Sequence, residues 1–204
     1  MEKIDLRRKF PLLYKASARK CDIITVPKLH YLMCDGKGDP NNSVMFQDVL
    51  NALYSLAYAM KFMLKKESVY PDYGIMPLEG LWWTDDMNNF SVNDKAAWKW
   101  TLMILQPDFI VPEIVERART LAASKKQLPK LAEVRLEYME EGECAQLLHI
   151  GPYNMEAENI QRLHTFIKEC GCKLHGKHRE IYLSDMRKTA PEKLKTIIRQ
   201  PMRK

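Results

Sequence analysis

The sequence predicts an α+β fold built from two successive modules, each with the element order strand, helix, strand, strand. Short segments that alternate apolar and polar residues recur between turn residues, as half-buried strands do. Longer segments carry apolar residues at helical spacing, which favours helices that lie on a sheet. We expect residues 1–21 to be a lead-in segment that packs weakly, and residues 22–204 to form one domain. Module one spans about residues 22–127, and module two about 128–204.

Module one is expected to begin with a strand over residues 23–33. A long helix is expected over residues 43–65, because Ser43 offers an N-cap and a stripe of apolar side chains follows at helical spacing. Pro112 suits the first turn of a second helix. The other expected elements are a strand over 73–83, a polar turn over 85–94, a strand over 97–105 and the second helix, to about residue 126.

Module two repeats this order. It is expected to contain strands over 134–138 and 143–150, a helix over 155–170, a strand over 178–185 and a short strand over 196–199. Laying the middle strands of the two modules over each other places Glu79 and Glu180 at equivalent positions. Two half-sheets related in this way would leave a groove between the modules, and small ligands bind in such concave places.

The segment His178–Asp185 has two different faces. Strand alternation sends Ile181 to one face and Glu180 and Tyr182 to the other. Residues two apart on a strand lie about 6–7 Å from one another, so this carboxylate and this phenol can reach one small molecule. The pair fits acid/base chemistry or cation binding. The alternative is a solvated edge strand on which the two side chains are incidental.

Charge and cysteine content exclude several classes of function. The net charge of +6 is spread over helix faces and both ends of the chain, and no recognition helix or aromatic-interleaved basic patch is present, so we expect no nucleic acid partner. The five cysteines include no C-x-x-C pair, so reduced thiols are expected. Cys170 and Cys172 lie near histidines, but the spacing matches no zinc pattern, and no metal or other cofactor is expected.

No apolar segment reaches the length of about 18 residues that a membrane span needs, and the first residues lack the apolar core of a signal peptide. We therefore expect a cytoplasmic protein without a membrane partner. A monomer or weak homodimer is expected. About 20 residues precede the first strand, which is too few for a helix-turn-helix and its linker, so a DNA-binding regulator is disfavoured.

Several motifs together resemble the GyrI-like small-molecule-binding domain in its stand-alone form. The resemblance covers nearly the whole chain, from about residue 22 onward. The residues that carry it are Thr25–Pro27, Gly36–Gly38, Pro77–Trp82, Gln106–Phe109, Leu148–Tyr153 and His178–Asp185 continuing through Thr196.

The resemblance implies a duplicated module with a mainly antiparallel sheet, helices on one side and a ligand groove between the modules. It also implies that this groove takes bulky, often cationic aromatic drugs, as in multidrug-binding relatives. In some stand-alone relatives the groove hydrolyses cyclopropane-bearing DNA-alkylating compounds, which is a detoxification. Glu180 matches the acidic residue that activates water, and Tyr182 lies beside it.

The candidate ligand-binding residues are Glu79, Trp82, Trp98, Trp100 and Tyr153. Tryptophans stack on planar aromatic ligands and attract cations, although they are equally good core residues. Glu79 either faces the groove as the partner of Glu180 or simply follows Pro77 at a strand start. Tyr182 either donates a hydrogen bond to the ligand or fills the groove floor.

Three functions remain open. The first is a hydrolase that adds water to the strained ring of a cyclopropanoid compound, with Glu180 as the base. The second is a drug-binding or sequestering module without chemistry. In the third, an acidic surface would mimic DNA, and the net charge of +6 argues against it.

Overall fold

The computed structural model describes residues 3–41, 43–85 and 95–204. The chain divides into two compact units that interleave along the sequence. They do not coincide with the two sequence modules, because each unit takes segments from both halves. Unit 1 comprises Met1–Lys9, Leu29–Met76 and Asn93–Met139, and unit 2 comprises Phe10–Lys28, Pro77–Val92 and Glu140–Lys204. The polar turn expected over residues 85–94 lies outside the described residues, apart from Asp85.

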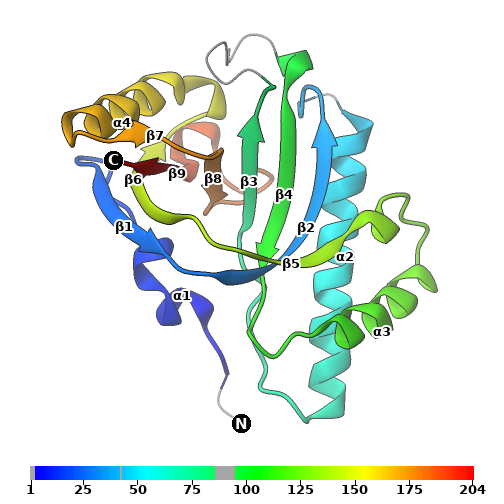
Figure 1. Cartoon of the computed structure of the whole chain (residues 1–204). Helices are drawn as coiled ribbons and strands as arrows, with labels where there is room; N and C mark the ends of the chain where they lie inside the picture. The colour runs from blue at the N-terminus through cyan, green and yellow to red at the C-terminus, as the bar shows by residue number, and fades with distance from the viewer. Residues whose placement is uncertain (1–2, 42, 86–94) are drawn as a thin grey trace. The chain divides into compact units, whose positions relative to one another are not determined.

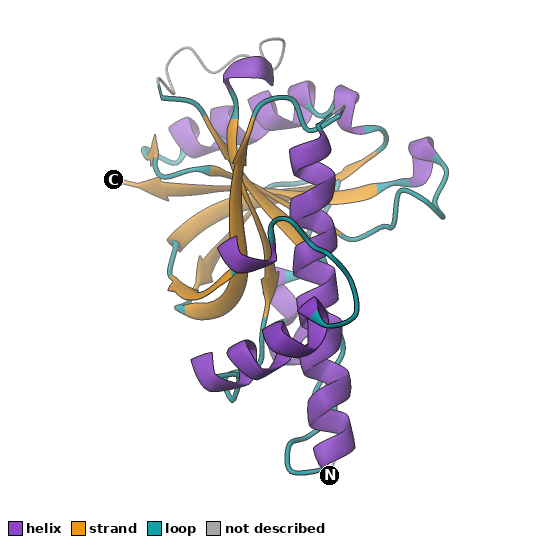
Figure 2. Ribbon diagram, turned by 90° about the vertical axis from the view of Figure 1, so that its right-hand side faces the viewer, coloured by secondary structure: helices purple, strands orange, loops and turns teal. Residues whose placement is uncertain are grey.

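Unit 1 is a small antiparallel sheet covered by two helices (Figures 1 and 2). Its strands lie in the order β4-β2-β5. The long helix α2 packs on β2 and β4, and α3 packs on α2. The bounds are β2 Leu29–Lys37, α2 Val44–Glu67, β4 Lys99–Leu105, α3 Pro112–Ala123 and β5 Arg135–Met139, with the short helix α1 at Leu6–Lys9.

Unit 2 is a larger antiparallel sheet in the order β1-β6-β9-β8-β3. The two-residue strand β7 adds to the end of β9, and helix α4 packs on β6 and β9. The α+β class and the antiparallel pairing predicted from the sequence are confirmed. The bounds are β1 Asp22–Val26, β3 Leu78–Trp83, β6 Gly142–Ile150, α4 Ala157–Glu169, β7 Lys173–Leu174, β8 His178–Tyr182 and β9 Lys195–Arg203.

Helix α2 forms where its sequence signals place it. The Ser43 hydroxyl accepts a hydrogen bond from the backbone N–H of Phe46 at 3.2 Å, which caps the first turn. The apolar stripe is buried, and Leu53 and Met60 are inaccessible to solvent. Ser68 ends the helix in the left-handed conformation. The prediction of this helix is therefore confirmed to within two residues at its end.

The single strand expected over residues 23–33 is two strands. The break falls at Pro27 and Lys28, between β1 in unit 2 and β2 in unit 1. Proline has no backbone N–H to donate to a neighbouring strand, so it favours the end of a strand over its middle. The apolar residues Val26 and Leu29 on either side of the break made the two strands look continuous in the sequence.

Part of the lead-in segment is tied to unit 2 more firmly than the sequence suggested. Leu13 is buried, and its backbone oxygen accepts a hydrogen bond from Arg199 Nη2 at 2.5 Å. Gln146 Nε2 donates to the backbone oxygen of Leu12 at 2.9 Å. Arg199 and Gln146 are buried and cannot bind water, so these hydrogen bonds satisfy their polar atoms. The segment therefore covers one face of the sheet.

The core of unit 1 closes around Trp100. Its ring is fully buried, meets the ring of Phe46 edge-on at 5.2 Å, and donates a hydrogen bond from Nε1 to the backbone oxygen of Gly38 at 3.1 Å. Gly36 lies opposite Trp100 in the β2–β4 pairing, and a Cβ atom built there would come within 2.0 Å of the indole. Only a residue without a side chain leaves room for the ring.

Gly36→Ala should therefore destabilise the protein by about 1–3 kcal/mol or more, because the indole must leave its position or the strands must separate. Urea unfolding monitored by circular dichroism measures this change. Gly74→Ala is the matched control, since a Cβ atom there meets nothing within 4 Å, and its effect should stay within about 0.5 kcal/mol. Equal stability of the two variants would contradict the packing described for Trp100.

Candidate functional site

The two faces of β8 in unit 2 carry different chemistry. His178, Glu180 and Tyr182 lie on one face, and Arg179 and Ile181 lie on the other, as strand alternation requires. On the neighbouring strands, Gly80 pairs with Glu180, and Thr196 pairs with Tyr182. Because Gly80 has no side chain, other side chains can occupy the space beside Glu180.

Both oxygens of Glu180 have a neighbour on β8 itself. The Tyr182 hydroxyl donates a hydrogen bond to Oε2 at 2.7 Å, and Nε2 of His178 lies 3.5 Å from Oε1. The Glu180 side chain keeps 13% of its surface exposed, whereas His178 keeps 5%. The predicted pair of Glu180 and Tyr182 is thus in direct contact, and both side chains are partly buried.

A second carboxyl group joins this pair. Glu156 lies between the short 3-10 turn Tyr153–Met155 and the start of α4, and it is only 4% exposed. Burial, followed by the negative charge of Glu180, raises the pKa of Glu156 far above that of an ordinary glutamate, although the Thr196 hydroxyl opposes the shift. Its Oε1 atom is buried and has no hydrogen-bond partner among the described residues. Glu156 is therefore expected to be protonated at neutral pH.

The sequence analysis missed Glu156. The residue occupies the N-cap position of α4, where its side chain makes no capping hydrogen bond. Glutamate is not among the favoured N-cap residues, so its presence directly after the Gly151–Tyr153 stop was a weak signal that its carboxyl serves another purpose. The partner that it meets lies on a different strand, which the local pattern does not specify.

Two tyrosines enclose the carboxyl pair. The rings of Tyr153 and Tyr182 meet edge-to-face, with centroids 5.6 Å apart. Burial raises the pKa of Tyr153 to about 12, and burial together with the charge of Glu180 raises the pKa of Tyr182 well above its ordinary value. Both phenols therefore stay neutral at physiological pH, so each remains able to donate a hydrogen bond to a carboxylate or a ligand.

Trp82 lies over the gap that Gly80 leaves. A Cβ atom at Gly80 would come within 2.8 Å of Trp82 Nε1, and the indole is 3% exposed. Gly80 pairs with Glu180, and Trp82 lies two residues further along the same strand, so Trp82 belongs to the site face of the sheet.

His149 fixes the turn that carries Tyr153 and Glu156. Its Nε2 lies 3.1 Å from the backbone oxygen of Pro152, and its Nδ1 lies 2.9 Å from the side-chain nitrogen of Asn159. A carbonyl oxygen only accepts and an amide nitrogen only donates, so these partners select the tautomer with the proton on Nε2. His149 is a satisfied structural histidine that holds the turn against α4.

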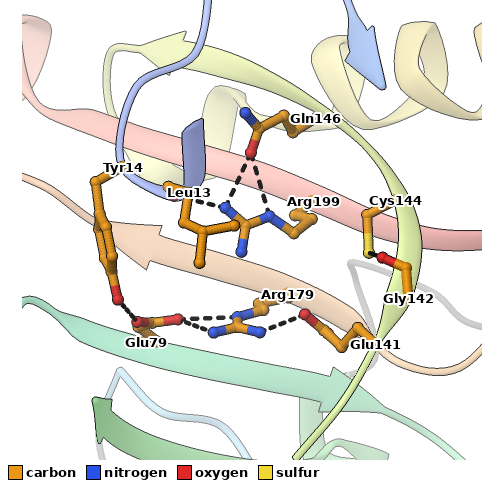
Figure 3. Close-up of polar contacts among 9 residues, drawn as sticks. All are labelled: Leu13, Tyr14, Glu79, Glu141, Gly142, Cys144, Gln146, Arg179 and Arg199. Atoms are coloured by element: carbon orange, nitrogen blue, oxygen red, sulfur yellow. Dashed lines mark hydrogen bonds and ion pairs between the residues drawn. The ribbon is translucent and has the colours of Figure 1, made fainter. Parts of the chain in front are cut away.

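Glu79 pairs with Ile181, whereas its neighbour Gly80 pairs with Glu180, so Glu79 lies on the opposite face of the sheet from Glu180. Figure 3 shows Glu79 between Tyr14 and Arg179. Its carboxylate is fully buried, and it accepts hydrogen bonds from Arg179, with Nε at 2.9 Å, and from the Tyr14 hydroxyl at 2.8 Å. Arg179 also pairs with Glu141, so the guanidinium is held between two carboxylates. The ligand-binding role expected for Glu79 stays a prediction, and in this arrangement its charge is already matched within the protein.

Trp98 and Trp100 both belong to unit 1. Trp98 is partly buried just before β4, and Trp100 is fully buried in the core, so stacking on a ligand would require its ring to move. Their ligand-binding roles stay predictions. Of the predicted site residues, the structure brings Glu180, Tyr182, Tyr153 and Trp82 together on one face of unit 2.

Comparison with known protein families identifies the family of the chain. A model of the GyrI-like small-molecule-binding domain matches residues 19–203. The chain belongs to the GyrI-like family. No functionally curated protein matches the sequence at a significant level.

Solved GyrI-like structures extend the comparison. An uncharacterized conserved protein from Listeria innocua is 38% identical, with a TM-score of 0.91 over 98% of this chain and 100% of that one. A hydrolase encoded by lin2189 from Listeria innocua is also 38% identical, with a TM-score of 0.88 over 99% of this chain and 100% of that one. The EcmrR C-terminal domain is 13% identical, with a TM-score of 0.60 over 91% of this chain and 98% of that one, which shows a shared fold.

Within the described ranges, no group of three or more His, Cys, Asp or Glu side chains is placed to hold a metal ion. None of the helices in the described part of the chain combines the length and the apolar character that a membrane span requires.

Glu79→Gln tests the buried ion pair. The change keeps the shape of the side chain but removes one of the two carboxylates that pair with the buried Arg179, so it should cost about 3–5 kcal/mol. Asp108→Asn is the control. It breaks the exposed pair between Lys9 and Asp108, which should cost less than about 1 kcal/mol. Urea unfolding measures both variants, and a small effect at Glu79 would argue against the network in Figure 3.

The stability of Glu156→Gln relative to the unmodified protein should increase as the pH rises. The folded-state pKa of Glu156 lies above its unfolded value, so the native protein is favoured most below about pH 4 and loses stability on the way toward the folded-state pKa. Gln does not titrate, so its advantage should grow from pH 5 to pH 9 by at most about 1.4 kcal/mol per pH unit. Thermal unfolding at several pH values measures it. Glu158→Gln, at an exposed residue in the first turn of α4, is the control, and parallel curves for all three proteins would refute the burial of a protonated Glu156.

Proposed function

We propose that the Glu180 face of unit 2 binds bulky aromatic small molecules, and that the protein is a hydrolase that adds water to cyclopropane-bearing electrophilic compounds. One observation carries the proposal. The Glu180 carboxyl is partly accessible, one of its oxygens is held by a neutral phenol, and a second, buried carboxyl group lies beside it. The similarity to Listeria innocua proteins that are described as hydrolases supports the enzymatic reading.

Glu180 is the proposed base. Its carboxylate takes a proton from a water molecule while the water oxygen attacks a carbon of the strained ring. The carbon–oxygen bond forms as a ring carbon–carbon bond breaks, and the electron pair of the broken bond moves into the conjugated carbonyl group of the substrate. That oxygen is then protonated, so the product is the substrate plus one water. Ring strain has already raised the free energy of the substrate, so positioning and one base suffice.

Tyr182, Tyr153 and Trp82 supply the aromatic surface and the hydrogen-bond donors. Tyr182 orients the Glu180 carboxylate through its 2.7 Å hydrogen bond, so it assists the base without replacing it. Tyr153 and Trp82 offer faces on which a planar ligand stacks. Movement of Trp82 or of the 3-10 turn would widen the place for a ligand, because both side chains are largely enclosed here.

A binding module without chemistry is the second candidate. The favouring observation is the charge of the site, since among the described residues no lysine or arginine forms an ion pair with Glu180 or Glu156. A carboxylate in aromatic surroundings attracts a cationic aromatic ligand whether or not a reaction follows. The protein would then sequester drugs and return them unchanged.

Glu180→Gln separates the two candidates. With a panel of cyclopropane-bearing aromatic alkylators, mass spectrometry should detect products heavier by one water, and turnover should fall by about 100-fold or more in the variant, because Gln takes up no proton. Tyr182→Phe should cost less. Glu192→Gln, an exposed residue of unit 2, should change nothing. Intact alkylators that are retained by the unmodified protein would favour the binding module, and turnover unaffected by Glu180→Gln would refute the assigned base.

A further inference from the structure

We propose that Glu156 is the proton-holding partner of Glu180: the two carboxyl groups share one proton, which keeps the site at a single negative charge. Glu156 is thereby a positioning residue, whose protonated carboxyl leaves Glu180 as the carboxylate that faces a ligand. The inference concerns the same site as the proposed function, and only the class of ligand used to test it rests on that function. The shared proton itself is a property of the protein without ligand.

The placement of Glu156 is the first argument. Its carboxyl is more than nine-tenths buried, and the buried Oε1 has no hydrogen-bond partner in the described part of the chain. An ionised carboxylate in that position would pay a desolvation cost with no cation to offset it. A protonated carboxyl avoids that cost, because it carries no charge.

The proximity of Glu180 is the second argument. Tyr153, three residues before Glu156, packs edge-to-face on Tyr182 with ring centroids 5.6 Å apart, and the Tyr182 hydroxyl donates to Glu180 Oε2 at 2.7 Å. The negative charge of Glu180 acts to keep the proton on Glu156, because two ionised carboxylates in one buried place repel each other. The two side chains come from separate elements, β8 and the start of α4, and are held there by the sheet and by the turn that His149 anchors.

Within the described part of the chain, no lysine or arginine forms an ion pair with either carboxyl of the pair, and the nearby Asp185 is itself paired with Arg187. Thr196 of β9 offers a neutral hydroxyl, and the phenols of Tyr153 and Tyr182 have raised pKa values. On α4, burial lowers the pKa of His164 to about 4, so that ring is neutral at pH 7. The remaining titratable neighbours are His178, with Nε2 3.5 Å from Glu180 Oε1, and Asp185, whose charge acts on Tyr153.

Because side chains alternate along a strand, Arg179 lies on the face of β8 opposite the carboxyl pair. On that face, Glu79 and Glu141 take up its charge. The site face therefore keeps one negative charge that the described groups leave uncompensated when His178 is neutral. A ligand with one positive charge on an aromatic body fits this charge, and a ligand with two would have to displace the shared proton.

Infrared titration of the protein without ligand tests the shared proton. The unmodified protein at pH 7 should show the carbonyl band of a protonated carboxylic acid, well above the pH at which ordinary glutamates lose it. Glu156→Gln should abolish this band, whereas Glu158→Gln, with an exposed glutamate on the same helix, should keep it. In Glu180→Gln the band should persist but titrate at lower pH, since the neighbouring charge is gone.

The same measurement can overturn the proposal. A protein without an acid band at pH 7 would mean that both carboxyl groups are ionised, and an unshifted titration in Glu180→Gln would mean that Glu156 is protonated by burial alone. If Glu156→Gln does not fold, glutamate labelled with ¹³C at the carboxyl carbon decides the question in the unmodified protein. Its NMR titration should then show one carboxyl that stays protonated through pH 7.

Tetraphenylphosphonium, a bulky aromatic monocation, tests the consequence for ligands at pH 7. Glu156→Gln should bind it within about threefold of the unmodified protein, because the charge of the site is unchanged, and Glu180→Gln should bind it at least tenfold more weakly. A loss of tenfold or more in Glu156→Gln would show that Glu156 carries a charge and would overturn the proposal. If the unmodified protein does not bind this cation, the ligand class of the proposed function fails, while the infrared titration still decides the shared proton.

Discussion

The buried guanidinium of Arg179 is the interaction on which unit 2 depends. It joins β8 to β3 through Glu79 and to the turn before β6 through Glu141, and Tyr14 brings the lead-in segment to the same carboxylate. A single unpaired charge in that position would cost several kcal/mol, so the three charged groups have to assemble together. Because successive residues of a strand alternate between faces, this anchoring of Arg179 also decides which way Glu180 points.

The two faces of the same sheet thus differ in the surroundings of their charged side chains. On the Arg179 face, Arg179 is paired with Glu79 and Glu141, and the buried Arg199 is held by the amide oxygen of Gln146 and the backbone oxygen of Leu13. On the Glu180 face, the neighbours are His178, two phenols with raised pKa values and a second carboxyl whose pKa is raised far above that of an ordinary glutamate. Such surroundings stabilise the native fold less than paired charges would, which is the usual relation between a binding site and the scaffold that carries it.

The sequence was sufficient for features that depend on neighbouring residues. Helix α2 followed from its cap and its apolar stripe, and the contact between Glu180 and Tyr182 followed from a spacing of two on a strand. Features that depend on strand register were beyond it. Laying the modules over each other made Glu79 equivalent to Glu180, but in the sheet Gly80 pairs with Glu180, and a shift of one residue moves Glu79 to the other face.

Glu156 shows the same limit from another direction. Nothing within its own turn identifies its partner, because the carboxyl that it meets is supplied by a strand that follows α4 and β7 in the chain. Burial and a like charge define its role, and both are properties of the assembled unit. A charged residue type at an unsuitable capping position was the one local sign.

The position of β9 in unit 2 has a consequence for synthesis. This strand follows every other element of the unit in the chain, yet it lies in the interior of the sheet, paired with β6 on one side and β8 on the other. During translation, β1, β3, β6 and β8 all leave the ribosome before the strand that separates β6 from β8 exists. Their exposed edges must be kept from pairing wrongly until β9 arrives, so the carboxyl pair is assembled only after the last strand has been made.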